Sequence, residues 1–264
     1  MKLRILSIIA LVFCVQTSSR GQGFCGLKND AYRNGEKLTY KVFYNVSFMY
    51  VGAGEVTFTT KLEQLSGVPV YHVIGEGHTY HSYDWVFKVR DQYETFIDTA
   101  TMLPLRFIRK VNEGDYHKFN TVTFDHSQHK AISRKGTYDV PECVQDVLSA
   151  VYYARNIDFN RYNPGDKIPF SMFLDDEVYH IYIRYLGKSK VTTRYGTFNA
   201  IEFSPLLIKG TIFEGGEKMT VWVSDDENKV PLRINSPITV GSVKVDLIGY
   251  QNLRHPFSAL ISKK

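Results

Sequence analysis

The sequence lacks the motifs by which many enzymes are recognised. It has no Gly-x-Ser-x-Gly elbow for a nucleophilic serine, no helical zinc motif and no Cys/His knuckle. Gly52 and Gly54 lie between predicted strands with no helix after them, so they do not form a phosphate-binding loop. We therefore expect no cofactor, and we do not expect the protein to be an enzyme.

Strong charge of one sign is also lacking. The chain carries 32 basic and 27 acidic residues, which gives a formal net charge of +5. Three of the basic residues, Lys2, Arg4 and Arg20, lie at the N-terminus, and without them the charge falls to +2. Because no segment is strongly basic, the sequence indicates neither a nucleic-acid partner nor an anionic membrane surface.

The N-terminus lacks an apolar run long enough to cross a bilayer. Its apolar stretch, Ile5–Val15, has about 11 residues, whereas a spanning helix needs roughly 20. Lys2 and Arg4 precede this stretch and small polar residues follow it, an order typical of a cleavable signal peptide, here residues 1–21. A buried N-terminal helix or strand is the alternative. We expect an exported protein that is periplasmic or envelope-associated and does not span the membrane after processing.

Cysteine is scarce, and of the three in the chain only Cys25 and Cys143 lie beyond the predicted signal peptide. Cys14 follows Phe13 and Cys25 follows Phe24, so neither has the small preceding residue of a lipid-anchored protein. The sequence thus favours a soluble mature chain. In an oxidising compartment Cys25 and Cys143 can form a disulfide. The alternative is a buried free thiol at Cys143 and an exposed one at Cys25.

What the sequence does contain, past residue 35, is alternation of apolar and polar residues. In Leu38–Phe48 nearly every second residue is apolar, as in a half-buried strand. Similar runs, separated by turns rich in Gly, Asn and Asp, occupy Val70–Tyr80, Trp85–Ile97, Lys118–Phe124, Val178–Leu186, Phe198–Phe203, Met219–Val223 and Ser242–Tyr250. The pattern predicts one mainly β domain over residues 22–264, built as an antiparallel curved sheet that forms a half-barrel or a barrel-like sandwich.

One segment has helical spacing instead. Between Asp139 and Asn156 the apolar residues Val144, Val147, Leu148 and Val151 recur three or four positions apart. Asp139 followed by Glu142 is similar to a helix cap, and Pro141 is tolerated in a first turn. The spacing predicts one central α-helix over about 140–156, with its apolar stripe packed against the sheet.

Two stretches of the chain are similar to each other. The motif Asp98…Pro104-Leu105-Arg106 recurs as Asp225…Pro231-Leu232-Arg233 at a spacing of 225 minus 98, or 127 residues. Neighbouring glycines and strands keep this spacing, which predicts an internal repeat of residues 71–125 and 198–252 and two similar β halves. Chance similarity of short β meanders is the alternative.

Three groups of residues are candidates for chemistry. His72, His78, His81 and Asp84 form the densest ligand-capable cluster, but alternation along a strand points His81 away from the other histidines, so surface histidines are the preferred interpretation. The acidic runs at 175–177 and 225–228 lack the ligand spacing of a calcium loop and indicate tight hairpins. Cys143, in the first turn of the predicted helix, is a weak candidate nucleophile because no histidine lies near it in sequence.

Aromatic residues give the only candidate binding site. They make up 14% of the chain and would line one or both faces of a curved sheet. If the sheet closes incompletely, its concave face is a groove for an apolar ligand; if it closes fully, the same rings form the core. The residues that we expect at such a ligand site are Tyr40, Tyr44, Tyr83, Trp85, Tyr182 and Trp222.

Six short segments of the chain form a recognisable combination: Val140–Asn156 (VPECVQDVLSAVYYARN), Gly35–Tyr40 (GEKLTY), Ser82–Trp85 (SYDW) with Lys88–Asp91 (KVRD), Arg194–Phe198 (RYGTF) and Val221–Asn228 (VWVSDDEN). In these segments the chain resembles domain-of-unknown-function family 3108, a group of exported proteins common in Bacteroidetes. The resemblance spans about residues 30 to 255 and implies an envelope-exposed, mainly β protein without an assigned activity.

These observations lead to three hypotheses of different classes. The first is an exported protein that binds an apolar or amphipathic envelope component, such as a lipid or an apolar small molecule, without catalysis. The second is a structural or interaction module that contacts an envelope protein through sheet edges or acidic turns. The third, a hydrolytic enzyme, would need polar residues that converge in a cleft, for example around His78, His81 and Asp84.

Overall fold

A computed structural model describes residues 25–264 except 47–48, 86, 209–214 and 239–240. The predicted signal peptide lies outside the described residues. The strands are β1 Lys37–Val46, β2 Met49–Leu65, β3 Val68–Thr79, β4 Arg90–Asp98, β5 Pro104–Glu113, β6 Tyr116–Asp125, β7 Lys130–Ser133, β8 Thr137–Asp139, β9 Lys167–Leu174, β10 Glu177–Thr192, β11 Gly196–Pro205, β12 Thr220–Ser224, β13 Pro231–Pro237, β14 Ser242–Gln251 and β15 Leu260–Lys263. The helices are α1 Val147–Ala154 and two single 3₁₀ turns, η1 His81–Tyr83 and η2 Phe159–Arg161.

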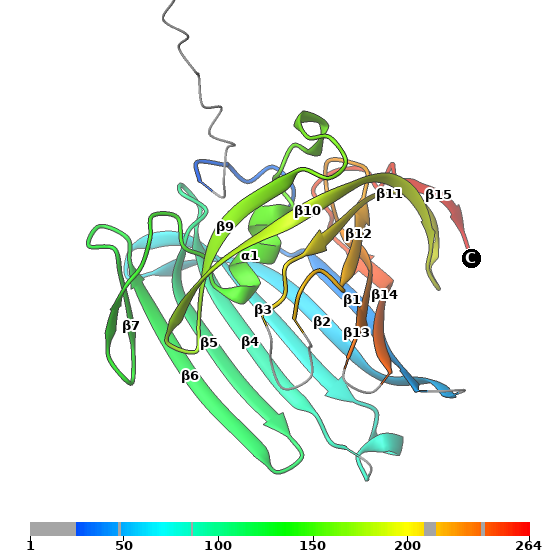
Figure 1. The fold of residues 1–264 in the computed structure, drawn as a ribbon, viewed down its shortest axis with the longest axis horizontal. Coiled ribbons are helices and arrows are strands. Elements are labelled where there is room, and N and C mark those ends of the chain that lie inside the picture. Colours follow the sequence, from blue (N-terminus) through cyan, green and yellow to red (C-terminus); the bar gives the residue numbers. More distant parts are fainter. Residues whose placement is uncertain (1–24, 47–48, 86, 209–214, 239–240) are drawn as a thin grey trace, which may run out of the picture.

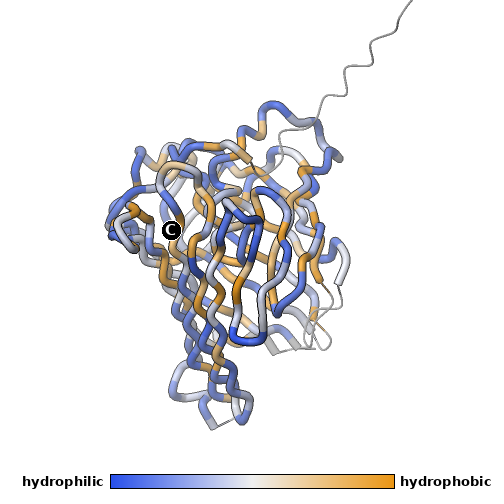
Figure 2. Tube along the Cα trace, turned by 90° about the vertical axis from the view of Figure 1, so that its left-hand side faces the viewer, coloured by the Kyte–Doolittle hydropathy of each residue, from blue (hydrophilic) through white to orange (hydrophobic). Residues whose placement is uncertain are grey.

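All the strands belong to one antiparallel sheet, in the order β8-β7-β6-β5-β4-β3-β2-β1-β14-β13-β12-β11-β10-β9, with β15 added beside β11. The sheet curves around α1 but does not close, and β9 and β10 pass across the helix (Figure 1). Apolar and polar residues alternate along the strands (Figure 2). The predicted fold class, a mainly β half-barrel with one helix, is confirmed.

The helix is shorter than the spacing predicts. It begins at Val147 because Asp146 is its N-cap: the Asp146 carboxylate accepts from the N–H groups of Leu148 and Ser149, both at 2.8 Å, and the Ser149 hydroxyl accepts from the Asp146 N–H. Cys143 has a φ of 59°, which an α-helix does not tolerate. The expected cap at Asp139 is therefore wrong, and Cys143 precedes the helix instead of occupying its first turn.

Two hydrophobic clusters hold the fold together. The larger one surrounds α1 and contains Tyr153, Phe107, Phe173 and Phe203 from the helix and three strands. The smaller one lies where β1, β11, β13 and β14 meet, and the C-terminal residues Leu253, Phe257 and Leu260 cover it. Phe58 of β2 packs against both clusters. The helix thus fills the concave side of the sheet, as its apolar stripe predicts.

The two ends of the chain repeat one topology. The six strands β9–β14 follow one another as a meander and begin at nearly the same spacings as β1–β6, and β14 pairs with β1 to join the two sets. A duplication stays a prediction, and this arrangement supports it.

Candidate functional site

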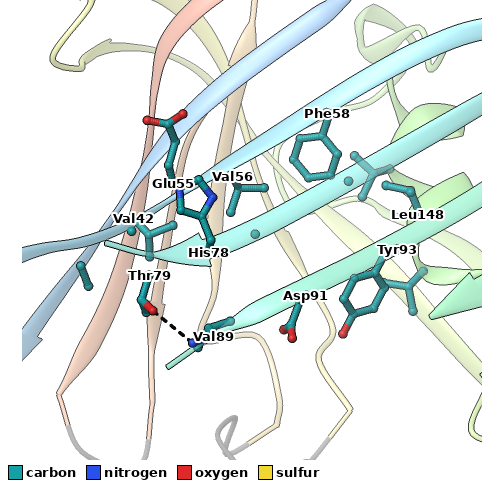
Figure 3. A pocket seen from close by; sticks show the side chains of 16 residues that line it. Val42, Glu55, Val56, Phe58, His78, Thr79, Val89, Asp91, Tyr93 and Leu148 are labelled. Atoms are coloured by element: carbon teal, nitrogen blue, oxygen red, sulfur yellow. Dashed lines mark hydrogen bonds between the residues drawn. The ribbon is translucent and has the colours of Figure 1, made fainter. Parts of the chain in front are cut away.

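An apolar pocket of about 390 Å³ lies between α1 and the sheet face formed by β1–β4 (Figure 3). Val42 of β1, Val56 and Phe58 of β2 and Tyr93 of β4 contribute side chains to it. The helix contributes Val147, Leu148 and Val151. The pocket has the size and apolar lining that small-molecule sites usually have.

Two glycines of β3 make room for this pocket. Gly75 pairs with Phe58 and Gly77 with Val56, so both glycines face the pocket. A Cβ on Gly75 would lie 2.8 Å from the Phe58 ring, whereas a Cβ on Gly77 would make an ordinary 3.5 Å contact with Val56. Gly77 therefore leaves open space that a larger side chain would fill. Glycine inside a strand often marks a place where another group approaches closely.

The wall on the sheet side is held by aromatic packing. The Phe58 and Tyr40 rings meet edge to face at 5.7 Å, and Tyr40 is buried in the smaller cluster. Burial raises the pKa of Tyr93, so its phenol stays neutral. These rings give the pocket a rigid apolar wall.

Polar groups of the pocket wall lie toward the β3–β4 connection. The Thr79 hydroxyl donates to Asp84 at 2.8 Å and accepts from the Val89 N–H at 3.1 Å. Asp91 accepts from the Asn112 N–H at 2.8 Å. Burial, together with the Asp91 carboxylate, raises the pKa of Glu113. A bound molecule would find hydrogen-bonding groups here and apolar contacts toward α1.

No serine or cysteine is among the described residues that line this pocket. Its ionisable residues are Glu55, His78, Asp91 and Tyr93. Glu55 and His78 pair directly across β2 and β3, at positions that alternate with the glycines, so their side chains point to the other face of the sheet. This arrangement suits binding of an apolar body and offers no nucleophile with its base.

None of the six aromatic residues expected at a ligand site lines the pocket. Tyr40 lies behind Phe58, in the smaller cluster. Trp222 pairs with Arg233, whose guanidinium binds Asp246, so the indole shares a face with that ion pair. The other four are spread over the sheet and one loop: Tyr44 lies near the end of β1, Tyr83 in η1, Trp85 in the loop after η1, and Tyr182 within β10. Gly75 and Gly77, two glycines inside one strand, indicate the pocket better than the aromatic residues do, and the sequence interpretation did not use them.

The histidine cluster does not assemble. His72 lies between Glu63 and Glu94, at 3.1 and 2.9 Å, and its ring stacks on Phe96. His81 contacts Asp84 instead. Arg90 binds the same carboxylate at 2.7 Å and holds the pKa of Asp84 at about 2. His72 is buried, so the interpretation of these residues as surface histidines is wrong for His72.

A disulfide joins Cys25 to Cys143, with the Cα atoms 5.4 Å apart. Among the described residues, Cys25, Glu142 and Cys143 are the one group close enough to hold a metal. The sulfurs of the two cysteines are bonded to each other, so this group offers no thiolate ligand. For the same reason Cys143 is not a nucleophile in this form.

The acidic runs at 175–177 and 225–228 lie at turns between strands, and the first of them also forms ion pairs that the sequence did not reveal. Asp175 and Asp176 both have positive φ angles, and Leu174 pairs with Glu177 around them, as in a tight two-residue hairpin. Asp175 also forms ion pairs with Arg109 and Lys118. The β9–β10 hairpin is thereby fastened to β5 and β6, across the concave side of the sheet.

Comparison with known proteins identifies the family. Residues 39–248 match the family described as "Protein of unknown function (DUF3108)". The chain belongs to this family. No protein with a curated function is significantly similar to this DUF3108 chain. No helix among its described residues is long and apolar enough to cross a membrane.

Solved structures show the fold that this DUF3108 chain shares with others. It is similar to the beta-barrel-like protein of domain of unknown function DUF1849 from Brucella abortus, with a TM-score of 0.53 and 11% identity over 84% of this chain and 99% of that one. Weaker likenesses are to a candidate lipoprotein from Parabacteroides distasonis (TM-score 0.40, 12% identity, 85% and 100% covered) and a candidate exported protein from Bacteroides fragilis (0.33, 14%, 86% and 100%). At such identities the likeness is one of fold alone.

Proposed function

We propose that this DUF3108 protein is exported and binds, without catalysis, the apolar part of an envelope component in the pocket between α1 and β1–β4. The observation that carries the proposal is the pocket itself, whose wall is apolar and whose space depends on Gly77. Export is supported by the charged, apolar and small-residue order of the N-terminus.

A single substitution can fill the pocket without disturbing the strand. In Gly77→Leu the new side chain points at Val56 and occupies the open space, while leucine suits a strand interior better than glycine. We expect binding of an uncharged fluorescent probe, N-phenyl-1-naphthylamine, to weaken about tenfold or more, and the midpoint of thermal unfolding to stay or rise. Fluorescence titration and thermal unfolding measure the two effects.

Glu76→Leu is the matched control, because it places the same side chain one residue earlier, on the opposite face of β3. It should bind the probe as the natural protein does. Equal affinity of Gly77→Leu and the natural protein would contradict the proposal. Mass spectrometry of lipid extracted from protein purified out of its native envelope would then identify the ligand class.

A further inference from the structure

Two loops meet at one end of the sheet, beside the pocket. The β3–β4 connection and the β5–β6 hairpin lie at the same end in Figure 1. They are joined by a hydrogen bond from the Gly114 N–H to the Lys88 carbonyl, at 2.8 Å, and by pairing of Val89 with Glu113. A Cβ on Gly114 would lie only 3.2 Å from the Phe87 ring, so the hairpin packs directly on the connection.

Three large aromatic side chains are exposed on these joined loops. Trp85 is 85% exposed, Phe87 52% and Tyr116 54%. We call these three residues the aromatic rim. Such a group of exposed rings costs solubility and marks a surface that contacts something apolar.

The base of the β3–β4 connection is fixed in place. Arg90 binds both Asp84 and the Thr79 hydroxyl, and Thr79 also binds Asp84. The Trp85 indole N–H donates to the Ser82 carbonyl at 2.9 Å, which fixes the edge of the ring. The exposure of Trp85 is therefore built into the loop.

The aromatic rim adjoins the pocket through shared residues. Thr79, Val89 and Asp91 line the pocket, and they also begin and end the connection that carries Trp85 and Phe87. An apolar molecule is poorly soluble in water, because its apolar surface is unfavourable there. A site for such a molecule works best when it adjoins the surface that supplies it.

The charge around the rim favours a neutral apolar surface. Lys88 and Asp115 are exposed charges of opposite sign on the two loops, and Arg90 already neutralises Asp84. Aromatic rings with a polar edge, such as tryptophan and tyrosine, prefer the interfacial layer of a phospholipid bilayer.

From these contacts we propose that the aromatic rim docks on a phospholipid bilayer by inserting Trp85, Phe87 and Tyr116 into its interfacial layer. The exchange of ligand between bilayer and pocket rests on the proposed function, whereas the docking itself does not. Because the rim carries little net charge, docking depends on ring insertion and changes little with salt.

Tryptophan fluorescence provides a direct test, since the chain contains only two tryptophans, Trp85 and Trp222. In the Trp222→Phe variant of the mature protein, Trp85 is the sole tryptophan. We expect its emission to shift to shorter wavelength with uncharged phosphatidylcholine vesicles, and to be quenched by brominated acyl chains. An unchanged spectrum at saturating vesicle concentration would overturn the proposal.

A second variant tests the rim by vesicle sedimentation. Trp85→Ser combined with Phe87→Ser should weaken vesicle binding about tenfold or more, because two exposed rings are lost. Leu62→Ser is the control, since Leu62 is 52% exposed and lies on β2 opposite Tyr71, toward the other end of the sheet. Equal binding of the double variant and the control would also overturn docking.

Gly77→Leu separates the two proposals. It fills the pocket and leaves the rim intact, so it should lose probe binding and still sediment with vesicles. If the natural protein binds vesicles but no probe, the result supports docking on the bilayer and contradicts ligand binding in the pocket. A photoreactive side chain at position 85 that captures a protein and no lipid would contradict bilayer docking.

Discussion

At the residue scale, a few buried polar groups decide how firmly α1 is held against the sheet. Asp146 is fully buried at the start of the helix and accepts a hydrogen bond from the Thr95 hydroxyl of β4 at 2.6 Å. Arg155, just after the helix, forms two hydrogen bonds with the buried Glu36 carboxylate, at 2.6 and 2.8 Å. Both ends of the helix are thus joined by polar contacts to parts of the chain distant in sequence.

The Asp146 carboxyl should make stability depend on pH. Burial raises its pKa from 3.8 to about 6, against the opposing effect of its hydrogen bonds. The folded state therefore binds a proton that the unfolded state releases, so this group favours folding most below pH 3.8 and loses that contribution as pH rises through about 6. Asp146→Asn keeps the cap and removes the charge. We expect it to be more stable than the natural protein at pH 7.5, by roughly 1–3 kcal/mol.

Urea unfolding at several pH values measures this difference, which should shrink as the pH falls from 6 to 4. Asp146→Ala is the comparison, because it removes the cap and leaves the Thr95 hydroxyl unpaired. It should be less stable than Asp146→Asn by about 1–3 kcal/mol at every pH, because neither variant carries the titrating carboxyl. A stability difference between Asp146→Asn and the natural protein that does not change with pH would show that Asp146 has an ordinary pKa.

The Arg155–Glu36 pair should be sensitive to the loss of one partner. Arg155 is 2% exposed and Glu36 0%, and the guanidinium also donates to the Asn228 carbonyl. Burial lowers the pKa of Arg155, but the Glu36 carboxylate more than offsets this and raises it. Glu36→Gln leaves a buried charge without its counter-ion, and we expect a loss of about 3–5 kcal/mol in the free energy of unfolding.

Asp139→Asn breaks the exposed pair with Lys130 and is the control, with an expected loss of at most about 1 kcal/mol. Joint replacement of Glu36 and Arg155 by methionine should recover much of the loss, since no unpaired charge remains. Equal losses in Glu36→Gln and Asp139→Asn, measured by urea unfolding, would contradict a buried ion pair.

At the element scale, the segment before α1 is organised by its disulfide. Cys143 in its left-handed conformation turns the chain, and the next residues form a short parallel bridge in which Gln145 pairs with Met172 of β9. The disulfide joins this turn to Cys25 across 118 residues of sequence. It therefore connects the described N-terminus to the point where the helix is capped.

Removal of this disulfide should destabilise the protein. A cross-link that closes a long loop restricts the unfolded chain, and losing it costs about 2–5 kcal/mol. We expect a lower thermal unfolding midpoint in the Cys25→Ser, Cys143→Ser double variant, and a similar lowering when the natural protein is unfolded in reductant. The double variant should not respond to reductant. A natural protein whose unfolding is indifferent to reductant would contradict the cross-link.

At the scale of the whole molecule, the sheet stays open, and its concave side is covered by α1 and by the β9–β10 hairpin. The helix fills the concave side, and the hairpin between β9 and β10 reaches β5 and β6 through Asp175. In a closed barrel the aromatic side chains of the concave face would all be packed in the core, whereas the open sheet leaves space beside α1. That space is what the proposed function and the docking inference depend on.

The sequence by itself determined the class of fold, because the alternation of apolar and polar residues is local: each strand shows which of its faces is buried. It also determined that one helix exists, since the stripe of Leu148 and Val151 is a property of neighbouring residues. The start of that helix was missed because Asp139 and Asp146 look alike as caps in the sequence, and only the fold brings Thr95 to Asp146 and Cys25 to Cys143.

Only the tertiary structure decided where the pocket lies. Its space arises from the register that places Gly77 opposite Val56, and from packing of α1 over that face, and both join residues far apart in sequence. The aromatic residues were prominent in the sequence, but ring size alone does not tell core from surface. Burial of Tyr40 and exposure of Trp85 depend on which strands and loops become neighbours, and that is fixed when the sheet curves around the helix.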